Sequence, residues 1–230
     1  MNNRSDYVRP AAARLRGQRV PLPRILMLVC WLARACVCAA NGAAARADGA
    51  RIGSVRIYPA EHALVVTGWV NQVSGPVELL ACGPDGKTHE SVFVLAANPL
   101  DLQTALLLLD LRPGTPPASL GKGTPQGPAL DLWVHWSSGP SNMQARAESF
   151  LLNLRTREPL PETPWLFSGS AVDNGKFMAL MEESLVATFW DPWAIVNLPL
   201  ACGARDDLLV VNTNTVPPLQ TPVRIRFEVR

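Results

Sequence analysis

Most of the chain after residue 50 consists of short stretches in which hydrophobic and polar residues alternate. The clearest is 223–229, where valine, isoleucine and phenylalanine alternate with arginine and glutamate. Successive side chains of a β-strand point to opposite faces of a sheet, so a period of two predicts a strand with one buried face. The same pattern predicts further strands at 52–58, 64–70, 77–81, 88–95, 130–136, 146–154, 165–170, 184–190 and 208–211.

A turn signal at 84–86 separates two of these strands. It combines a proline, an aspartate and a glycine, which are the residues that short hairpin loops favour. We therefore expect 77–81 and 88–95 to pair as an antiparallel hairpin. In the second strand, alternation places His89 and Glu90 on opposite faces. Neither face is cleanly polar, which indicates a central strand that is covered on both sides.

A helix is predicted directly after this strand, at about 98–110. Asn98 is suited to cap it, and Pro99 suits the first helical position. The residues that follow form a wide apolar stripe at helical spacing, made of Leu102, Ala105, Leu106, Leu107, Leu108 and Leu109. Such a helix should pack against a sheet. The chain is thus predicted to adopt a β-rich α+β fold, with mostly antiparallel sheets and one strongly apolar packed helix.

The first 47 residues differ from the rest, because they contain eight arginines and one acidic residue. An apolar run at 25–40 follows a basic segment and precedes Ala-Arg-Ala at 45–47. This order is typical of a secretory signal with a small-x-small cleavage site, so we expect residues 1–47 to be a signal segment. The protein should then be exported, to the periplasm or cell envelope, and would attach to a membrane only through an uncleaved segment. Residues 48–230 should form one domain, with a surface loop rich in proline and glycine at 113–128.

Removing the signal segment changes the charge. The whole chain has 21 basic and 19 acidic residues, of which 8 and 1 lie before residue 48, so the remainder carries 13 and 18 and a net charge of about −5. Average composition shows no basic patch, and we therefore expect no nucleic-acid partner.

Cysteine usage bears on both redox state and cofactors. Cys30, Cys36 and Cys38 lie in the signal segment, which leaves Cys82 and Cys202 in the predicted domain. An even pair in an exported chain predicts a disulfide between them. Two thiols cannot supply the four thiolates of an iron–sulfur cluster, and no cofactor is expected.

His89–Glu90 is the most evident candidate for chemistry. It does not complete the zinc-protease pattern H-E-x-x-H, because position 93 is Phe93 and the segment is predicted to be a strand. His89 is then either a structural histidine in an apolar setting beside the helix or a ligand for a metal or small molecule. Asp191 is either a turn residue or, with His89 and Glu90, part of such a site.

The tryptophans offer a second kind of candidate. Trp133, Trp165 and Trp193 exceed what a core of this size needs, and exposed aromatic residues mark binding surfaces. The alternative is that they fill a β-rich core.

Several of these segments together resemble the YdjY-like domain family of exported bacterial proteins. The resemblance rests on Pro84-Asp-Gly-Lys87, His89-Glu-Ser91 and Asn98-Pro-Leu-Asp101 before the leucine-rich helix, and on Trp165, Phe167–Ser170, Asp191–Pro192, Asn197, Asp206–Asp207, Val211–Asn212 and Pro217–Pro218 further on. Leu208 departs from it, because an aromatic residue is expected there. The resemblance covers 51–230 and implies no reaction.

Two functional hypotheses follow. The first is an exported, non-catalytic domain that binds an envelope protein or ligand. The second is a metal-binding protein or enzyme that uses His89 with distant acidic residues. An aromatic surface without converging titratable groups would favour the first, and a pocket where such groups converge would favour the second.

Overall fold

The computed structural model describes residues 49–230, and the predicted signal segment lies outside these residues. The strands are β1 (Ala50–Ile52), β2 (Val55–Tyr58), β3 (Ala63–Val70), β4 (Leu79–Cys82), β5 (Ser91–Leu95), β6 (Ala129–Ser138), β7 (Ser141–Arg146), β8 (Leu151–Asn153), β9 (Glu158–Pro159), β10 (Trp165–Phe167), β11 (Val172–Asp173), β12 (Lys176–Phe177), β13 (Ser184–Ala187), β14 (Val196–Asn197), β15 (Leu209–Val211) and β16 (Pro222–Val229). The α-helices are α2 (Pro99–Leu108) and α3 (Met178–Glu182). No helix within 49–230 is long and apolar enough to cross a membrane.

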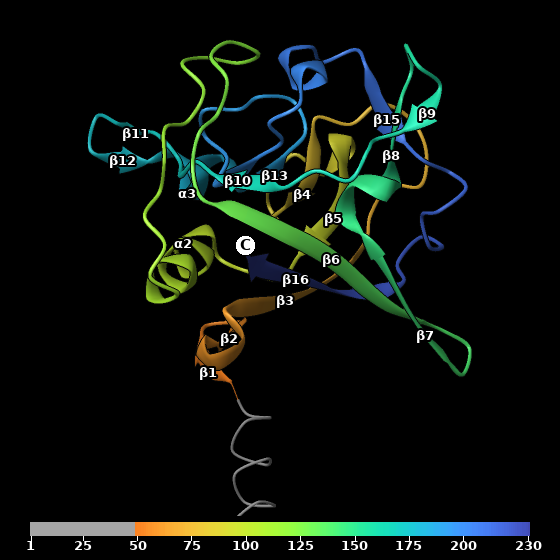
Figure 1. Cartoon of the computed structure of the whole chain (residues 1–230), viewed down its shortest axis with the longest axis horizontal. Coiled ribbons are helices and arrows are strands. Elements are labelled where there is room, and N and C mark those ends of the chain that lie inside the picture. Colours follow the sequence, from red (N-terminus) through yellow and green to blue (C-terminus); the bar gives the residue numbers. More distant parts are fainter. Residues whose placement is uncertain (1–48) are drawn as a thin grey trace, which may run out of the picture. The chain divides into compact units, whose positions relative to one another are not determined.

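Eight strands of the main sheet close on themselves, in the order β3, β16, β6, β10, β14, β13, β4 and β5, with β5 pairing back to β3 (Figure 1). Most neighbours are antiparallel, as predicted, but β4–β5 and β13–β14 are parallel. The result is a closed, mixed barrel. β2 and then β1 extend the sheet outward from β3, and β7 extends it from β6.

The barrel interior is a continuous apolar core. The inward residues of β16 and β6 are buried, including Ile225, Phe227 and Val134. Phe150 meets Phe93 and Trp136 edge-to-face, with ring centroids 5.4 and 5.8 Å apart. Alternation along β6 and β16 therefore predicted both the strands and the faces that they bury.

The predicted hairpin of 77–81 with 88–95 is wrong. β4 and β5 lie side by side but run parallel, and the chain passes between them through a 3-10 turn, η2 (Thr88–Glu90). The Asn71 amide donates to the carbonyl oxygens of Thr88 and Ser91, at 2.5 and 2.9 Å. These bonds satisfy backbone groups of the connection, so it need not form a ladder. β5 itself is buried along its whole length, as its sequence predicted.

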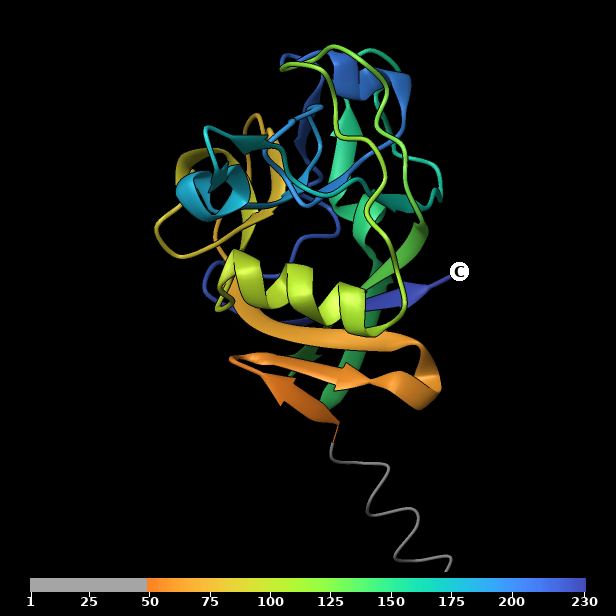
Figure 2. The same cartoon turned by 90° about the vertical axis from the view of Figure 1, so that its left-hand side faces the viewer.

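Helix α2 begins at the predicted residues, but its buried face is narrower than the predicted apolar stripe. The Asn98 Oδ1 accepts a hydrogen bond from the Leu100 N–H at 2.8 Å. Leu102, Ala105 and Leu106 are fully buried, whereas Leu108 is 60% exposed. Leu107 is also exposed, so the predicted stripe is too wide. Figure 2 shows α2 beside β2 and β3, with α3, which was not predicted, above it.

The prediction of one strand at 146–154 is wrong in part. β7, which ends at Arg146, pairs with β6, and the chain then turns through η3 (Ala147–Phe150) before the short strand β8. The segment at 113–128 contains no named strand or helix, and backbone bridges such as Thr115 with Gln126 hold its two arms together.

Candidate functional site

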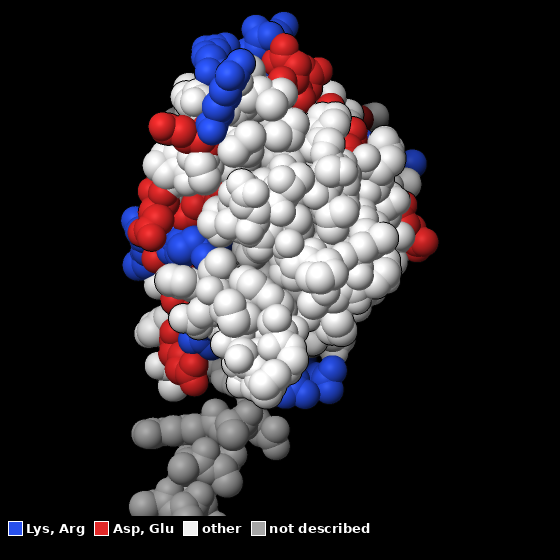
Figure 3. Space-filling model, turned by 90° about the vertical axis from the view of Figure 1, so that its right-hand side faces the viewer, with Lys and Arg blue, Asp and Glu red and all other residues white. Residues whose placement is uncertain are grey.

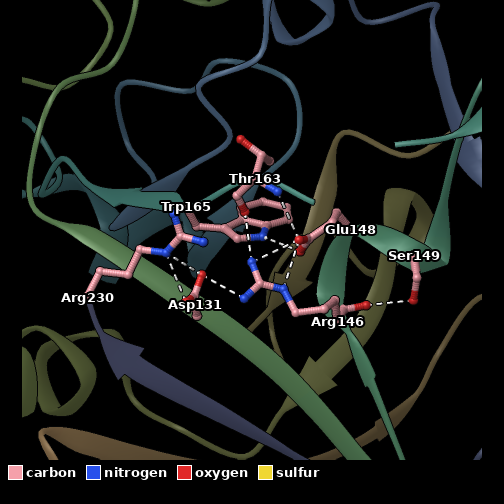
Figure 4. Close-up of polar contacts among 7 residues, drawn as sticks. All are labelled: Asp131, Arg146, Glu148, Ser149, Thr163, Trp165 and Arg230. Carbon is pink, nitrogen blue, oxygen red and sulfur yellow. Dashed lines mark hydrogen bonds and ion pairs between the residues drawn. The ribbon is translucent and has the colours of Figure 1, made fainter. Parts of the chain in front are cut away.

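One group of buried charges lies where β6, η3 and β10 meet (Figure 4). Glu148 is 1% exposed, and its Oε1 accepts hydrogen bonds from Arg146 Nε at 2.9 Å and from the Thr163 N–H at 3.0 Å. Its Oε2 accepts one from Trp165 Nε1 at 3.2 Å. Arg146 also pairs with Asp131 at 2.6 Å, which in turn pairs with Arg230.

Every charge in this network has a partner within the network. The effect of the hydrogen bonds and ion pairs of Arg146 and Glu148 is to fasten the strand β10 to the hairpin of β6 and β7. We therefore assign the network to the fold. Trp165 is fully buried in it, so its predicted role in a binding surface is wrong.

A different group of charges lies on the outer face of the sheet formed by β1, β2, β3, β16 and β6. Cross-strand register places Arg51 opposite Arg56, Arg56 opposite Val65, and Val65 opposite Arg226. In the next row, Arg224 lies between Thr67 and His135. Side chains in one row of a sheet share a face, so these basic residues project from the same surface.

These side chains line a cavity of about 440 Å³, which we call the basic groove. Its lining consists of Arg51, Ser54, Arg56, Tyr58, Val65, Thr67, His135, Arg224 and Arg226. Alternation in these five strands determines most of this lining, because the strands turn mainly apolar residues inward to the core and mainly polar residues outward, with Val65 as an apolar exception.

The arginines of the groove differ in whether an acidic side chain neutralises their charge. Arg226 pairs with Glu61 at 2.9 Å and with Glu228, and its guanidinium lies over the Tyr58 ring. Arg51, Arg56 and Arg224 form no ion pair with any residue in 49–230. The groove therefore carries uncompensated positive charge.

His135 adds a polar group without a partner. Its Nε2 is buried, and no hydrogen-bond partner for it exists among the described residues. Burial lowers the pKa of His135, and the nearby charges of Arg224 and Arg226 lower it further. An anion in the groove would supply both an acceptor for this nitrogen and a compensating charge.

The groove presents groups that can bind an anion. Guanidinium groups present paired N–H donors that match carboxylate and phosphate oxygens. Ser54, Thr67 and Tyr58 supply hydroxyls that can add further hydrogen bonds to such a group. The arrangement can hold an anionic group against a partly apolar floor.

The sequence prediction of no basic patch is wrong. The net charge of residues 48–230 is about −5, but that average conceals a local cluster. Arg224 and Arg226 alternate along the clearest predicted strand, and Arg51 and Arg56 lie within or beside another. This alternation was the signal that could have located the groove, although it could not show that the strands are neighbours.

The structure places His89 away from its predicted setting. Its side chain is 79% exposed, on η2 and outside β5, with Nε2 3.8 Å from Glu90 Oε2. The 3-10 turn causes this, because it ends the strand alternation before residue 91. A buried structural histidine is therefore excluded.

Asp191 lies apart from the surface and does not form a metal site. It is 3% exposed, burial raises its pKa, and its Oδ1 accepts a hydrogen bond from the Trp193 N–H at 2.8 Å. Burial lowers the pKa of Lys87, but the carboxylates of Glu90, Asp191 and Glu78 together raise it above its ordinary value. The charge of Lys87 therefore interacts with both Asp191 and Glu90. Within 49–230 no three residues of the metal-ligating types come together.

The other predicted residues are divided between surface and interior. Trp133 lies on the outer sheet face opposite Arg226, with the Arg146 guanidinium 5.3 Å from its ring centroid. Trp193 is half-buried. Cys82 is buried and Cys202 half-buried, no disulfide joins them, and burial raises the pKa of both thiols.

Comparison of the chain with protein-family models, curated proteins and solved structures found no match.

Proposed function

We propose that residues 48–230 form a non-catalytic domain of an exported protein, and that its basic groove binds an anionic group of another component of the cell envelope. The observation that carries this proposal is that three unpaired guanidiniums, those of Arg51, Arg56 and Arg224, line one groove together with His135, whose Nε2 has no partner. Unpaired like charges repel each other in the empty groove, and a bound anion relieves that repulsion.

The type of ligand follows from the shape and the charge of the domain. A cavity of about 440 Å³ accommodates a small group such as a phosphate or carboxylate with part of its carrier. A long nucleic acid is a poor fit, because the net charge of about −5 on residues 48–230 as a whole opposes it. The proposed partner is therefore an envelope molecule that presents a single anionic group.

The export of the protein and its resemblance to the YdjY-like domain family belong to the same proposal. The basic segment, the apolar run and the Ala-Arg-Ala sequence at 45–47 support export. The segments from Pro84 to Asp101 support the resemblance, which implies an envelope setting and no reaction. Sequencing the N-terminus of protein recovered from the envelope tests export, and a chain that retains its first residues in the cytoplasm would contradict it.

Titration of the purified protein with inorganic phosphate at low ionic strength tests the groove. We expect saturable binding, followed by calorimetry, that weakens as salt is added. Arg224→Gln should lower the phosphate affinity by about tenfold, which is about 1.4 kcal/mol, because a charge-assisted hydrogen bond is lost.

Arg112→Gln is the matched control. Arg112 is exposed and does not line the groove, so this variant should bind phosphate as the unaltered protein does. Equal affinity for the Arg224→Gln protein, or no phosphate binding by the unaltered protein, would rule out the proposed site.

A further inference from the structure

β7 has only one neighbour in the sheet. It pairs with β6 over its whole length, from Ser141 opposite Ser138 to Arg146 opposite Trp133. No other strand pairs with it among the described residues, and the one described hydrogen bond that reaches its backbone from a loop is donated by the Ser149 hydroxyl to the Arg146 carbonyl oxygen, at the end of the strand. In an antiparallel strand, every second residue directs its N–H and C=O away from a given neighbour. The outer edge of β7 therefore offers unused donors and acceptors.

This edge lacks the features that usually prevent a strand from pairing with another chain. Such features are charged residues, proline, a bulge or very short length. β7 is six residues long, and Ser141–Ala145 contains neither charge nor proline. Its register with β6 is continuous. The opposite edge of the sheet is different, because β1 has three residues and Arg51 at its centre.

The surface around β7 is also uncharged. Figure 3 shows the side of the molecule on which β7 lies, and a broad area there carries no lysine, arginine, aspartate or glutamate, which gather at its margin. Three segments without any charged residue are joined near this surface, namely 69–77, 136–145 and 208–223. The Val70 N–H donates a hydrogen bond to the Thr221 carbonyl oxygen at 3.0 Å, and Val223 lies opposite Trp136 in the sheet.

We propose that β7 pairs antiparallel with β7 of a second copy of this chain, about a two-fold axis at Met143. A two-fold axis perpendicular to an antiparallel pair passes between two identical residues, and Met143 is the middle of the uncharged run Ser141–Ala145. In this register Asn142 lies opposite Gln144 of the second copy, and Ser141 opposite Ala145. This pairing joins the main sheets of the two copies, each of which carries a basic groove, into one continuous sheet.

The register about Met143 favours a second copy as the occupant, because each uncharged residue of Ser141–Ala145 then faces another uncharged residue of the same run. Two domains that each carry a net charge of about −5 repel each other over most of their surfaces. The repulsion is least where both surfaces are uncharged, and β7 lies in such an area. The register also leaves Arg146 outside the paired run, so no like charges face each other. Met143, which is 42% exposed, becomes covered by its counterpart.

Cysteine crosslinking tests the register. In a Cys202→Ser background, Met143→Cys should give a disulfide-linked dimer in good yield under mild oxidation, because directly opposite residues have Cβ atoms about 4.5–5.5 Å apart. Asn142→Cys is the matched control. Its counterpart lies two residues away along the paired strand, which puts the Cα atoms about 8 Å apart and beyond disulfide reach. Equal yields from the two variants, or none from Met143→Cys, would overturn the proposed register.

Sedimentation velocity of the purified protein tests the dimer itself. We expect a concentration-dependent dimer, and Met143→Lys should weaken its association by at least about tenfold, because two lysines would face each other on an exposed strand. Leu219→Lys is the control, since Leu219 is 56% exposed on one of the uncharged segments and outside β7. It should dimerise like the unaltered protein. A protein that stays monomeric at about 100 µM, or a Met143→Lys protein that dimerises unchanged, would refute the pairing.

Discussion

Glu148 is a buried carboxylate whose two oxygens both accept hydrogen bonds, and it balances the charge of the buried Arg146. Replacing both members of such a pair with apolar residues can cost little. Removing Glu148 alone leaves Arg146 with Asp131 as its remaining acidic partner, and it leaves the buried N–H groups of Thr163 and Trp165 without their acceptor.

Glu148→Ala should therefore lower the free energy of unfolding by about 3 to 5 kcal/mol. Denaturant unfolding measures it. The control is Asp207→Asn, which breaks the exposed pair with Arg205 and should leave the unfolding midpoint unchanged. A Glu148→Ala protein as stable as the unaltered one would mean that the network contributes nothing to the fold.

His135 should make stability depend on pH. Burial and the charges of Arg224 and Arg226 lower its pKa below the ordinary 6.5, while Glu228 on the same strand partly opposes them. Two further residues share this face with His135: Gln144, which lies opposite it on β7 and carries no charge, and Asp131, which lies on β6 like His135 itself. The unfolded chain then binds a proton at a higher pH than the folded one, so stability is lost as the pH falls below about 6.5.

The measurement compares unfolding of the unaltered and His135→Gln proteins between pH 8 and pH 5. The unaltered protein should lose more stability on acidification, and saturating phosphate should reduce the difference, because a bound anion favours the protonated ring. Parallel pH profiles for the two proteins would show that His135 does not titrate differently on folding.

At the scale of elements, α2 shows how one apolar sequence serves two environments. Leu106 is fully buried, whereas Leu108 is 60% exposed, although both belong to the same run of leucines. Leu106→Ala should lower the free energy of unfolding by about 2 to 5 kcal/mol because it leaves a cavity. Leu108→Ala should change it by less than about 0.5 kcal/mol. Calorimetry distinguishes them, and equal losses would contradict the placement of the helix.

The same scale shows what sequence patterns can predict. Alternation in β16 and β6 and the Asn98–Pro99 start of α2 depend on neighbouring residues, and these features were predicted. The pairing of β4 with β5 depends on β13 and β3, which flank them from distant parts of the chain. The turn sequence at 84–86 favours a local reversal of the chain. In the structure it is part of a longer connection, after which β5 runs parallel to β4.

At the scale of the whole molecule, the candidate site was beyond sequence analysis for a similar reason. The basic groove joins residues near positions 51–58, 65–67, 135 and 224–226. Each of these segments shows its outward residues by alternation, but only the order of the strands reveals that the outward residues meet. His89 was more conspicuous in the sequence because its neighbours along the chain are also polar.

β16 is the last strand of the chain and lies between β3 and β6. Deleting residues 222–230 should therefore abolish cooperative unfolding, since two strands lose their shared neighbour and the barrel cannot close. Near-ultraviolet circular dichroism and thermal unfolding measure this. Deleting Arg230 alone, which removes only an exposed pair with Asp131, should leave a folded protein. A cooperatively folded protein without residues 222–230 would show that β16 is dispensable.

The position of β16 also determines when the protein can fold during its biogenesis. Val66 of β3 has its cross-strand partner, Ile225, far along the chain in β16. The edges of β3 and β6 that β16 will cover therefore stay open while the intervening chain is being made. A polypeptide that emerges from its N-terminus cannot close the barrel before β16 has emerged. Until β16 is in place, the edges of β3 and β6 that it covers are open to pairing with other chains, so their protection falls to other factors.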